Sequence, residues 1–162
     1  MSYSQNRAKE LFDRYSDYLE KIGFSVEKIE DGPEYVIVTE GQGKYHPVPL
    51  SVRIHREYDR MLFISRLPFA MKKGMLLEGS VATSIVNNLL AVGSFDYDIH
   101  TGEIYFRHSL CIYSNALPDE ETLASITRLV FLTIDQYNDK FLMVSDGRIE
   151  IEKFQDYVMD NL

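Results

Sequence analysis

Two acidic side chains and a histidine alternate with apolar residues along the stretch Asp96-Tyr97-Asp98-Ile99-His100. If this stretch is a β-strand, the three polar side chains lie on one face, where carboxylate and imidazole groups could bind a divalent cation. The hairpin that follows favours another interpretation. A two-residue turn at Thr101-Gly102 places Asp96 opposite Arg107, and a cross-strand charge pair of this kind contributes roughly 0.2–1 kcal/mol. We therefore interpret the three residues as a solvated face and predict no metal site.

His108 and Cys111 are the other side chains of this region that could do chemistry. His108 lies on the apolar face of its predicted strand, where a general base would need a neighbouring carboxylate or nucleophile. A nucleophilic Cys111 would need a neighbouring histidine or lysine that favours the thiolate. The sequence indicates neither partner, and it contains no glycine-rich phosphate loop, His-Glu-x-x-His, Gly-x-Ser-x-Gly or paired-cysteine motif. We predict that the protein is not an enzyme and binds no cofactor.

An apolar segment with neither helical nor strand periodicity runs from Leu67 to Leu77. It contains Pro68, Gly74 and two methionines, and methionine is common at surfaces that accept varied partners. Two interpretations remain open: a buried connection into the next helix, or a surface that contacts a partner or a second copy. On the second interpretation, the candidate contact residues in this segment and in the hairpin are Leu67, Phe69, Met71, Met75, Leu76, Tyr105 and Tyr113.

The elements that position these residues are predicted from periodicity. Apolar and polar residues alternate on both sides of the Thr101-Gly102 turn, which is typical of an antiparallel hairpin with one buried face. Helices are predicted before and after this hairpin, from about Ser80 and from Pro118. The remaining pattern predicts a helix over 4–22, strands over 24–30, 35–38, 48–54 and 61–67, and a last short helix over 151–158.

The fold class predicted from this order, α–β–β–β–β–α–β–β–α–α, is α+β. Short connections favour an antiparallel β-sheet with helices packed mainly on one face. Pro47 and Pro49 cannot donate hydrogen bonds to a neighbouring strand, so the start of their strand is expected at a sheet edge or a bulge.

Composition and charge exclude several classes of function. The 162 residues are 45% hydrophobic and carry a net charge of −8, which fits one domain, residues 1–162, with a sizeable core. The largest local basic group is Lys72-Lys73, too small to neutralise phosphates, so we expect no nucleic-acid partner. No apolar run approaches the roughly 18 residues of a membrane span, and the polar start lacks a signal-peptide pattern. We expect a cytoplasmic protein with no membrane partner.

The helix and hairpin in the second half of the chain are similar to a known bacterial family. Val86-Asn87-Asn88-Leu89-Leu90 lies on the predicted helix, Gly93-Ser94-Phe95-Asp96-Tyr97-Asp98 forms the first strand, and Ile104-Tyr105-Phe106-Arg107 follows the turn at Gly102. This arrangement, followed by the long helix from Pro118, resembles the YbjN-like family, whose members are regarded as regulators of sensory transduction. The resemblance covers roughly residues 80 to 142.

The resemblance implies both a fold and a mode of action. The YbjN-like family is similar in fold to class I type III secretion chaperones, which are small, acidic and usually dimeric, and which bind an extended segment of a partner protein. It therefore implies a type III secretion chaperone-like fold, an unidentified protein partner and a homodimer. No catalytic residue is carried over from the family.

The predicted function is a non-enzymatic protein-binding module, either chaperone-like or a regulatory adaptor. Two alternatives remain open. One is a small-molecule sensor or hydrolase with a site between sheet and helices, in which His108, Tyr97 and Tyr105 would be the polar groups. The other is a structural protein whose only function is self-assembly.

Overall fold

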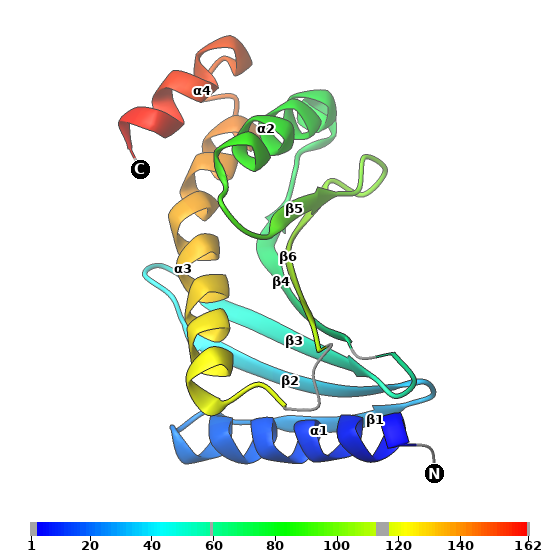
Figure 1. The fold of residues 1–162 in the computed structure, drawn as a ribbon. Helices are drawn as coiled ribbons and strands as arrows, with labels where there is room; N and C mark the ends of the chain where they lie inside the picture. The colour runs from blue at the N-terminus through cyan, green and yellow to red at the C-terminus, as the bar shows by residue number, and fades with distance from the viewer. Residues whose placement is uncertain (1–2, 59, 113–116, 162) are drawn as a thin grey trace.

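The computed structural model describes residues 3–58, 60–112 and 117–161 (Figure 1). The elements in chain order are α1 (Tyr3–Lys21), β1 (Glu27–Asp31), β2 (Glu34–Gln42), β3 (Pro47–His55), β4 (Arg60–Ala70), the short 3-10 turn η1 (Lys73–Met75), α2 (Leu76–Leu89), β5 (Ser94–Tyr97), β6 (Glu103–Cys111), α3 (Glu120–Ser145) and α4 (Ile151–Asp160). The predicted order of helices and strands and the α+β class are confirmed.

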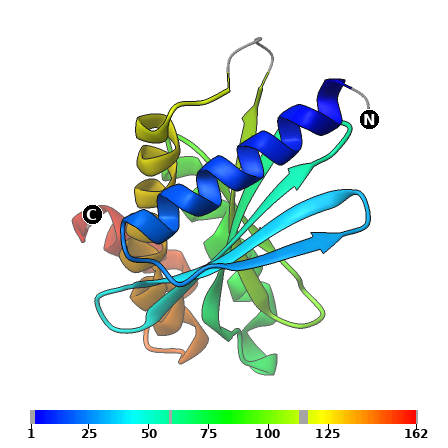
Figure 2. The ribbon, with the colours of Figure 1, turned by 90° about the horizontal axis from the view of Figure 1, so that it is seen from below.

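The six strands form one antiparallel sheet in the order β1-β2-β3-β4-β6-β5. Helix α1 packs against β2 and β3, and α3 packs against β3, β4 and β6. Figure 2 shows α1 crossing these strands, with α3 beside it on the same side of the sheet. Helix α2 packs against β5, and α4 packs against α2 and α3, at the end of the molecule far from α1 (Figure 1).

The face of the sheet toward α1 and α3 is mainly apolar because most alternate residues of each long strand are apolar. In β3, Val48, Leu50, Val52 and Ile54 are buried while the residues between them are half-buried or exposed. These side chains join the buried faces of the helices in one hydrophobic cluster. Burying apolar area of this kind supplies most of the favourable free energy of folding.

Helix α1 buries one stripe of side chains at helical spacing, including Leu11, Phe12, Tyr15 and Leu19. The Tyr15 hydroxyl lies in the core and donates to the hydroxyl of Thr127 on α3, which itself donates to the Leu123 carbonyl at 2.7 Å. Burial raises the pKa of Tyr15 well above its usual range. This buried hydrogen bond fixes how α1 sits against α3.

Helix α3 begins at Glu120, two residues after the predicted start at Pro118. The carboxylate of Asp119 accepts a hydrogen bond from the Thr122 backbone N–H at 2.7 Å, as expected of an N-cap residue. Bonds from Thr122 hold the pKa of Asp119 below its usual range. The helix ends at Ser145, where Arg148 N–H donates to the Met143 carbonyl at 2.9 Å across Gly147.

Two predictions about β3 and the hairpin need adjustment. Strand β3 is central rather than at an edge, but Pro47 and Pro49 pair only with β2, because the register with β4 runs over Ser51–Ile54. The predicted hairpin register is wrong by two residues: Asp96 lies opposite Tyr105, not Arg107. The reason is the Asp98 carboxylate, which accepts from His100 N–H at 2.8 Å and stabilises a longer turn.

The segment from Leu67 to Leu77 has regular structure that its sequence does not reveal. Strand β4 continues to Ala70 through a register shift between Arg66 and Ala70, and α2 begins at Leu76 rather than at Ser80.

None of the helices among the described residues combines the length and apolar character needed to cross a bilayer.

Candidate functional site

Two adjoining hollows lie along one side of α3. The first, of about 260 Å³, lies between α3, the end of α1, Phe24 and Gln42 at the end of β2. The second, of about 570 Å³, lies between α3, the β2–β3 loop and α4. They share Leu132 and Asp135. We call them together the α3 groove, lined mainly by Tyr18, Ile22, Phe24, Arg128, Phe131, Leu132, Asp135, Lys44, Tyr45, Asp139, Lys140 and Tyr157.

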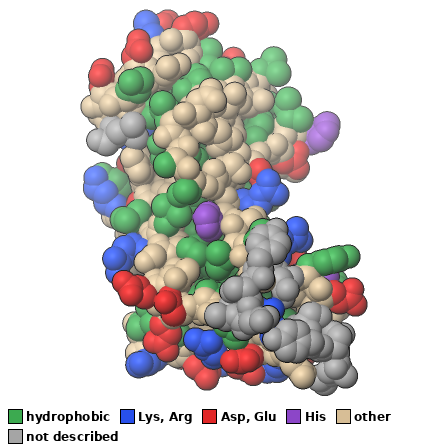
Figure 3. Space-filling view, in the orientation of Figure 1, with side chains coloured by type: hydrophobic (Ala, Val, Ile, Leu, Met, Phe, Trp, Pro, Cys, Tyr) green, Lys and Arg blue, Asp and Glu red, His purple; other side chains and the backbone are tan. Residues whose placement is uncertain are grey.

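The α3 groove has an apolar floor that solvent reaches. The rings of Phe24 and Phe131 stack with centroids 5.7 Å apart. Around them Leu132 is 60% exposed, Tyr45 54% and Ile22 47%. Figure 3 shows hydrophobic side chains at the surface beside α3, with charged side chains around them. Large apolar side chains grouped on one surface and rimmed by polar residues are typical of sites that contact another protein.

Two glycines at the end of β2 bring the β2–β3 loop close to α3. A Cβ atom on Gly41 would lie 2.8 Å from the Phe131 ring, and one on Gly43 would lie 2.5 Å from the Asp135 carboxylate. The Lys44 backbone N–H, next in the chain, donates to both oxygens of Asp135 at 3.0 Å. The sequence Gly41-Gln42-Gly43 is therefore a contact point with α3 and not only a turn.

Replacing Gly43 by alanine should destabilise the protein, because the added methyl group must displace Asp135 and the loop backbone. Overpacking of this kind costs about 1–3 kcal/mol. Chemical denaturation of Gly43→Ala measures the change. Gly74→Ala is the matched control, because a Cβ there would have nothing within 4 Å. Equal stability of the two variants would contradict the close contact between the loop and α3.

A buried lysine lies in the second hollow. Lys140 is only 7% exposed, and its ammonium group donates to the Gln136 carbonyl one turn earlier at 2.8 Å. Burial lowers the pKa of Lys140. The neighbouring Asp139 and Asp135 supply negative charge, and Arg128 supplies positive charge at the other end of the groove. The groove therefore offers an apolar floor with charges at its rim.

The residues predicted as a contact surface have different environments. Leu67 and Met71 are core side chains, 1% and 3% exposed. Phe69, Met75, Leu76 and Tyr105 are half-buried, and Tyr113 lies outside the described residues. Leu77, at the end of the same segment, is 71% exposed. A contact role for the segment remains a prediction, and only its solvent-accessible residues could make such contacts.

The polar residues considered for chemistry do not converge on one site. Tyr97 donates to the Leu76 carbonyl at 2.8 Å on the helix-covered side of the sheet, whereas Tyr105 donates to Glu103 on the opposite side. His108 is half-buried on the helix-covered side, and burial lowers its pKa. The proposed sensor or hydrolase site built from these three residues is therefore not formed.

The alternating acidic stretch also has structural partners. Asp96 forms an ion pair with Arg107 at 3.0 Å, and Asp98 accepts the turn hydrogen bond from His100. The described residues contain no group of three or more histidine, cysteine, aspartate or glutamate side chains that could hold a metal ion. Cys111 is exposed near the end of β6.

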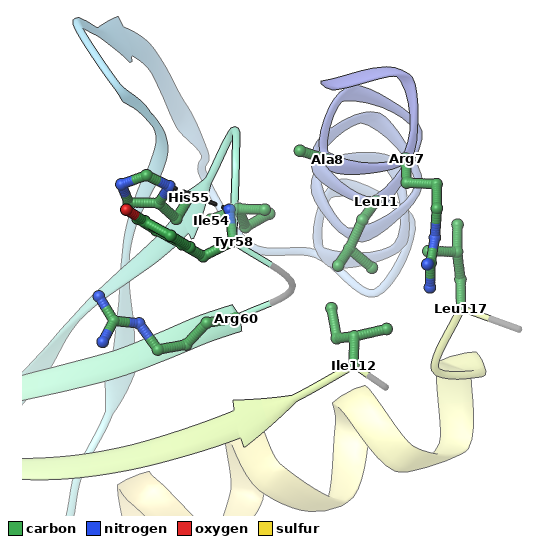
Figure 4. A pocket seen from close by; sticks show the side chains of 9 residues that line it. All are labelled: Arg7, Ala8, Leu11, Ile54, His55, Tyr58, Arg60, Ile112 and Leu117. Atoms are coloured by element: carbon green, nitrogen blue, oxygen red, sulfur yellow. Dashed lines mark hydrogen bonds between the residues drawn. The ribbon is translucent and has the colours of Figure 1, made fainter. Parts of the chain in front are cut away.

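A further crevice lies where α1, the β3–β4 turn and the end of β6 meet (Figure 4). His55 Nδ1 accepts there from the backbone N–H groups of Glu57 and Tyr58, at 3.1 and 3.2 Å. The volume of this crevice is only about 10 Å³, so the crevice offers no room for a ligand larger than about one water molecule.

The α3 groove is assembled from four separate parts of the chain, and the sequence analysis did not predict it. Two signals for it were present. Leu129, Phe131 and Leu132 make the middle of α3 apolar on several sides, and Gly41-x-Gly43 precedes a loop that contacts this helix. Neither signal says which side of α3 stays open.

Comparisons with known proteins add evidence about the fold. A solved structure of YbjN from E. coli, a proposed transcription regulator, matches 78% of this chain and 90% of its own with a TM-score of 0.55. The chain has the YbjN fold. The two sequences are 14% identical, so the match confirms the resemblance to the YbjN-like family at the level of fold. Neither the models of protein families nor the curated proteins give a match.

Proposed function

We propose that this YbjN-like protein is a non-enzymatic protein-binding module, acting as a chaperone-like or regulatory adaptor, and that the α3 groove receives a segment of its partner. The observation that carries this proposal is the exposure of Ile22, Tyr45 and Leu132 along one continuous groove. Exposed apolar side chains of this size are costly in water, and a partner that covers them gains that free energy.

The dimensions of the groove favour an amphipathic helix as the bound segment. The part of α3 that lines it runs from Ala124 to Lys140, which is roughly 24 Å at about 1.5 Å per residue. A helix of about sixteen residues could lie along it and place apolar side chains, one turn apart, against Phe131 and Leu132. This is the helix-in-groove mode of recognition.

Charge favours a basic partner. The protein carries a net charge of −8, although the groove itself carries both signs, with Asp135 and Asp139 beside Lys44, Lys140 and Arg128. The net negative charge of the protein would raise the association rate of a basic helix and disfavour acidic competitors. The YbjN structure supports the proposal only as a shared fold with a proposed regulator.

The test places a photo-activated cross-linking residue at Leu132 in one variant and at Leu77 in another. Both leucines are more than half exposed, so neither replacement should affect folding. We expect cross-links in native lysate to a small set of proteins at position 132 and not at 77. The cross-linked segment of each captured protein, identified by mass spectrometry, should be a basic amphipathic helix.

A second pair of variants decides which surface binds. Leu132→Asp should abolish binding of a synthetic peptide made from the captured segment, and Leu77→Asp should leave its affinity unchanged. The reverse result would move the contact surface to the 67–77 segment. Cross-links only to a second copy of the chain at position 132 would overturn the proposal of a foreign partner in the groove.

A further inference from the structure

The second face of the sheet carries no helix in the described part of the chain. Apolar side chains nevertheless lie on it: Val36 is only 9% exposed, and Val38, Leu62 and Ile64 are half-buried. We call this surface the open sheet face. An apolar centre on a solvated face is unusual for an isolated antiparallel sheet, in which that face is normally polar.

The residues on the open sheet face form two matching rows on either side of β3. Strands β2 and β4 both pair with β3 and therefore run in the same direction. The outward residues of β2 are Glu34, Val36, Val38 and Glu40. Those of β4, in the same order along the sheet, are Arg60, Leu62, Ile64 and Arg66. An acidic–apolar–apolar–acidic row thus lies opposite a basic–apolar–apolar–basic row.

The register aligns these rows residue by residue. Val36 and Leu62 both lie beside Arg53, and Val38 and Ile64 both lie beside Ser51. At one end of the rows, His55 pairs with Glu34. Because Met61 pairs with Ile54, the preceding residue Arg60 lies in the same row as His55 and Glu34. Strand β3 is therefore the line about which the two rows correspond.

We infer that two copies of the chain pack their open sheet faces together, related by a two-fold axis that runs along β3. Such a rotation places β2 of one copy over β4 of the other. Glu34 then faces Arg60, Glu40 faces Arg66, and the four apolar residues meet in the centre. One strand further out, Glu27 on β1 faces Arg107 on β6, since both lie in the row of Val38 and Ile64. Each contact occurs twice.

Charge pairs within one copy do not prevent this arrangement. Arg53 lies 3.5 Å from Glu34, Arg66 lies 2.7 Å from Glu103, and Arg107 lies 3.0 Å from Asp96. These arginine side chains remain about half exposed, and exposed pairs contribute little. The Arg53 side chains of the two copies approach the axis, where each can stay directed at its own Glu34.

The area is that of a small specific interface. The axis along β3 superposes β1 on β6, β2 on β4 and β3 on itself and leaves β5 uncovered. With neighbouring strands about 4.8 Å apart and about 3.3 Å per residue, the strands that overlap present a face of roughly 600 Å². Specific protein interfaces begin at roughly 600 Å² on each partner. This inference does not depend on the α3 groove, which lies on the other side of the sheet.

Charge reversal on the two rows gives a decisive test, with molar mass measured by light scattering across a concentration series. Wild-type protein should be dimeric. The variant with Glu34→Arg and Glu40→Arg, and the variant with Arg60→Glu and Arg66→Glu, should each dimerise at least roughly tenfold more weakly, since like charges then face each other. An equimolar mixture of the two should form a heterodimer, because opposite charges face each other again at every position.

Controls make each outcome decisive. Glu152→Arg with Asp156→Arg on α4 changes the net charge by the same amount as Glu34→Arg with Glu40→Arg, but away from the open sheet face, and should leave the dimer unchanged. Circular dichroism checks that each double variant is folded. If a double variant is unfolded, the single substitution Glu40→Arg or Arg66→Glu takes its place in the experiment. A monomeric wild type, a dimer that ignores both reversals, or a mixture that stays monomeric would overturn the inference. Loss of the dimer in Leu132→Asp alone would place the second copy in the α3 groove instead.

A cross-link along the axis tests the geometry directly. Ser51 lies on β3 at the centre of the open sheet face, so it should face Ser51 of the second copy. In a Cys111→Ser background, Ser51→Cys should give a covalent dimer with a short bismaleimide, whereas Ser80→Cys on α2 should not. Equal yields at the two positions would contradict the two-fold axis along β3.

Discussion

Replacing Phe95 by alanine should lower the free energy of unfolding by about 3–5 kcal/mol, the usual range for removing a buried phenylalanine ring. Phe95 is 2% exposed and joins the sheet to α3. Its ring centroid lies 5.1 Å from Phe141, 5.2 Å from Phe106 and 5.7 Å from Tyr137, each in an edge-to-face arrangement. Alanine removes these contacts and leaves a cavity that the two neighbouring elements cannot close without moving.

The measurement is chemical denaturation followed by circular dichroism. Ile99→Ala is the control, since Ile99 follows in the same hairpin but is 43% exposed and should change stability by about 0.5 kcal/mol or less. The loss expected for Phe95→Ala is a substantial part of the total stability of an ordinary domain. If Phe95→Ala were as stable as Ile99→Ala, the junction between β5 and α3 would not be part of the core.

Much of the fold could be predicted from the sequence, because its local signals agree with its packing. Alternation in Val48–Ile54 predicts β3, and helical spacing from Leu11 to Leu19 predicts α1. Pro118 predicts the start of α3 to within two residues. Each of these signals depends on neighbours within a few residues, and the tertiary structure buries the face that the pattern marks as apolar.

The remaining features depend on contacts between distant parts of the chain. In the 67–77 segment, the register shift between Arg66 and Ala70 interrupts the alternation, and Met71 enters the core because its backbone N–H donates to the Gly102 carbonyl at 2.8 Å. The α3 groove likewise requires the Gly43 loop to meet Asp135, which lies far along the chain. Sequence patterns within one element do not specify such contacts.

The pattern that resembles the YbjN-like family has a physical explanation here. Gly93 has a φ of +73°, and a Cβ atom there would collide with the ring of Phe106. Asn87 on α2 binds the outer edge of β5: its side-chain oxygen accepts from Phe95 N–H at 2.7 Å, and its side-chain NH₂ donates to the Phe95 carbonyl at 2.9 Å. These residues close the end of the sheet against α2.

Replacing Asn87 by aspartate should lower the free energy of unfolding by about 1–3 kcal/mol, the cost of leaving a polar group without its hydrogen-bond partner, because Asn87 is half-buried. One carboxylate oxygen can still accept from Phe95 N–H. The other replaces the NH₂ group and faces the Phe95 carbonyl, so two acceptors oppose each other and no donor remains. Urea denaturation near neutral pH, where the aspartate is ionised, measures the loss.

Asn88→Asp is the matched control, because it adds the same charge to the exposed neighbouring position of the same helix and should change stability by about 0.5 kcal/mol or less. Asn87→Ala separates the loss of the hydrogen bonds from the added charge, because it removes both hydrogen bonds without adding a charge. The stability of Asn87→Ala should lie between those of the control and Asn87→Asp. Equal effects of Asn87→Asp and Asn88→Asp would mean that α2 does not bind the edge of β5. The outer edge of β5 would then be available for pairing with another strand, and the end of the sheet beside α2 would become a third candidate surface for partner contact.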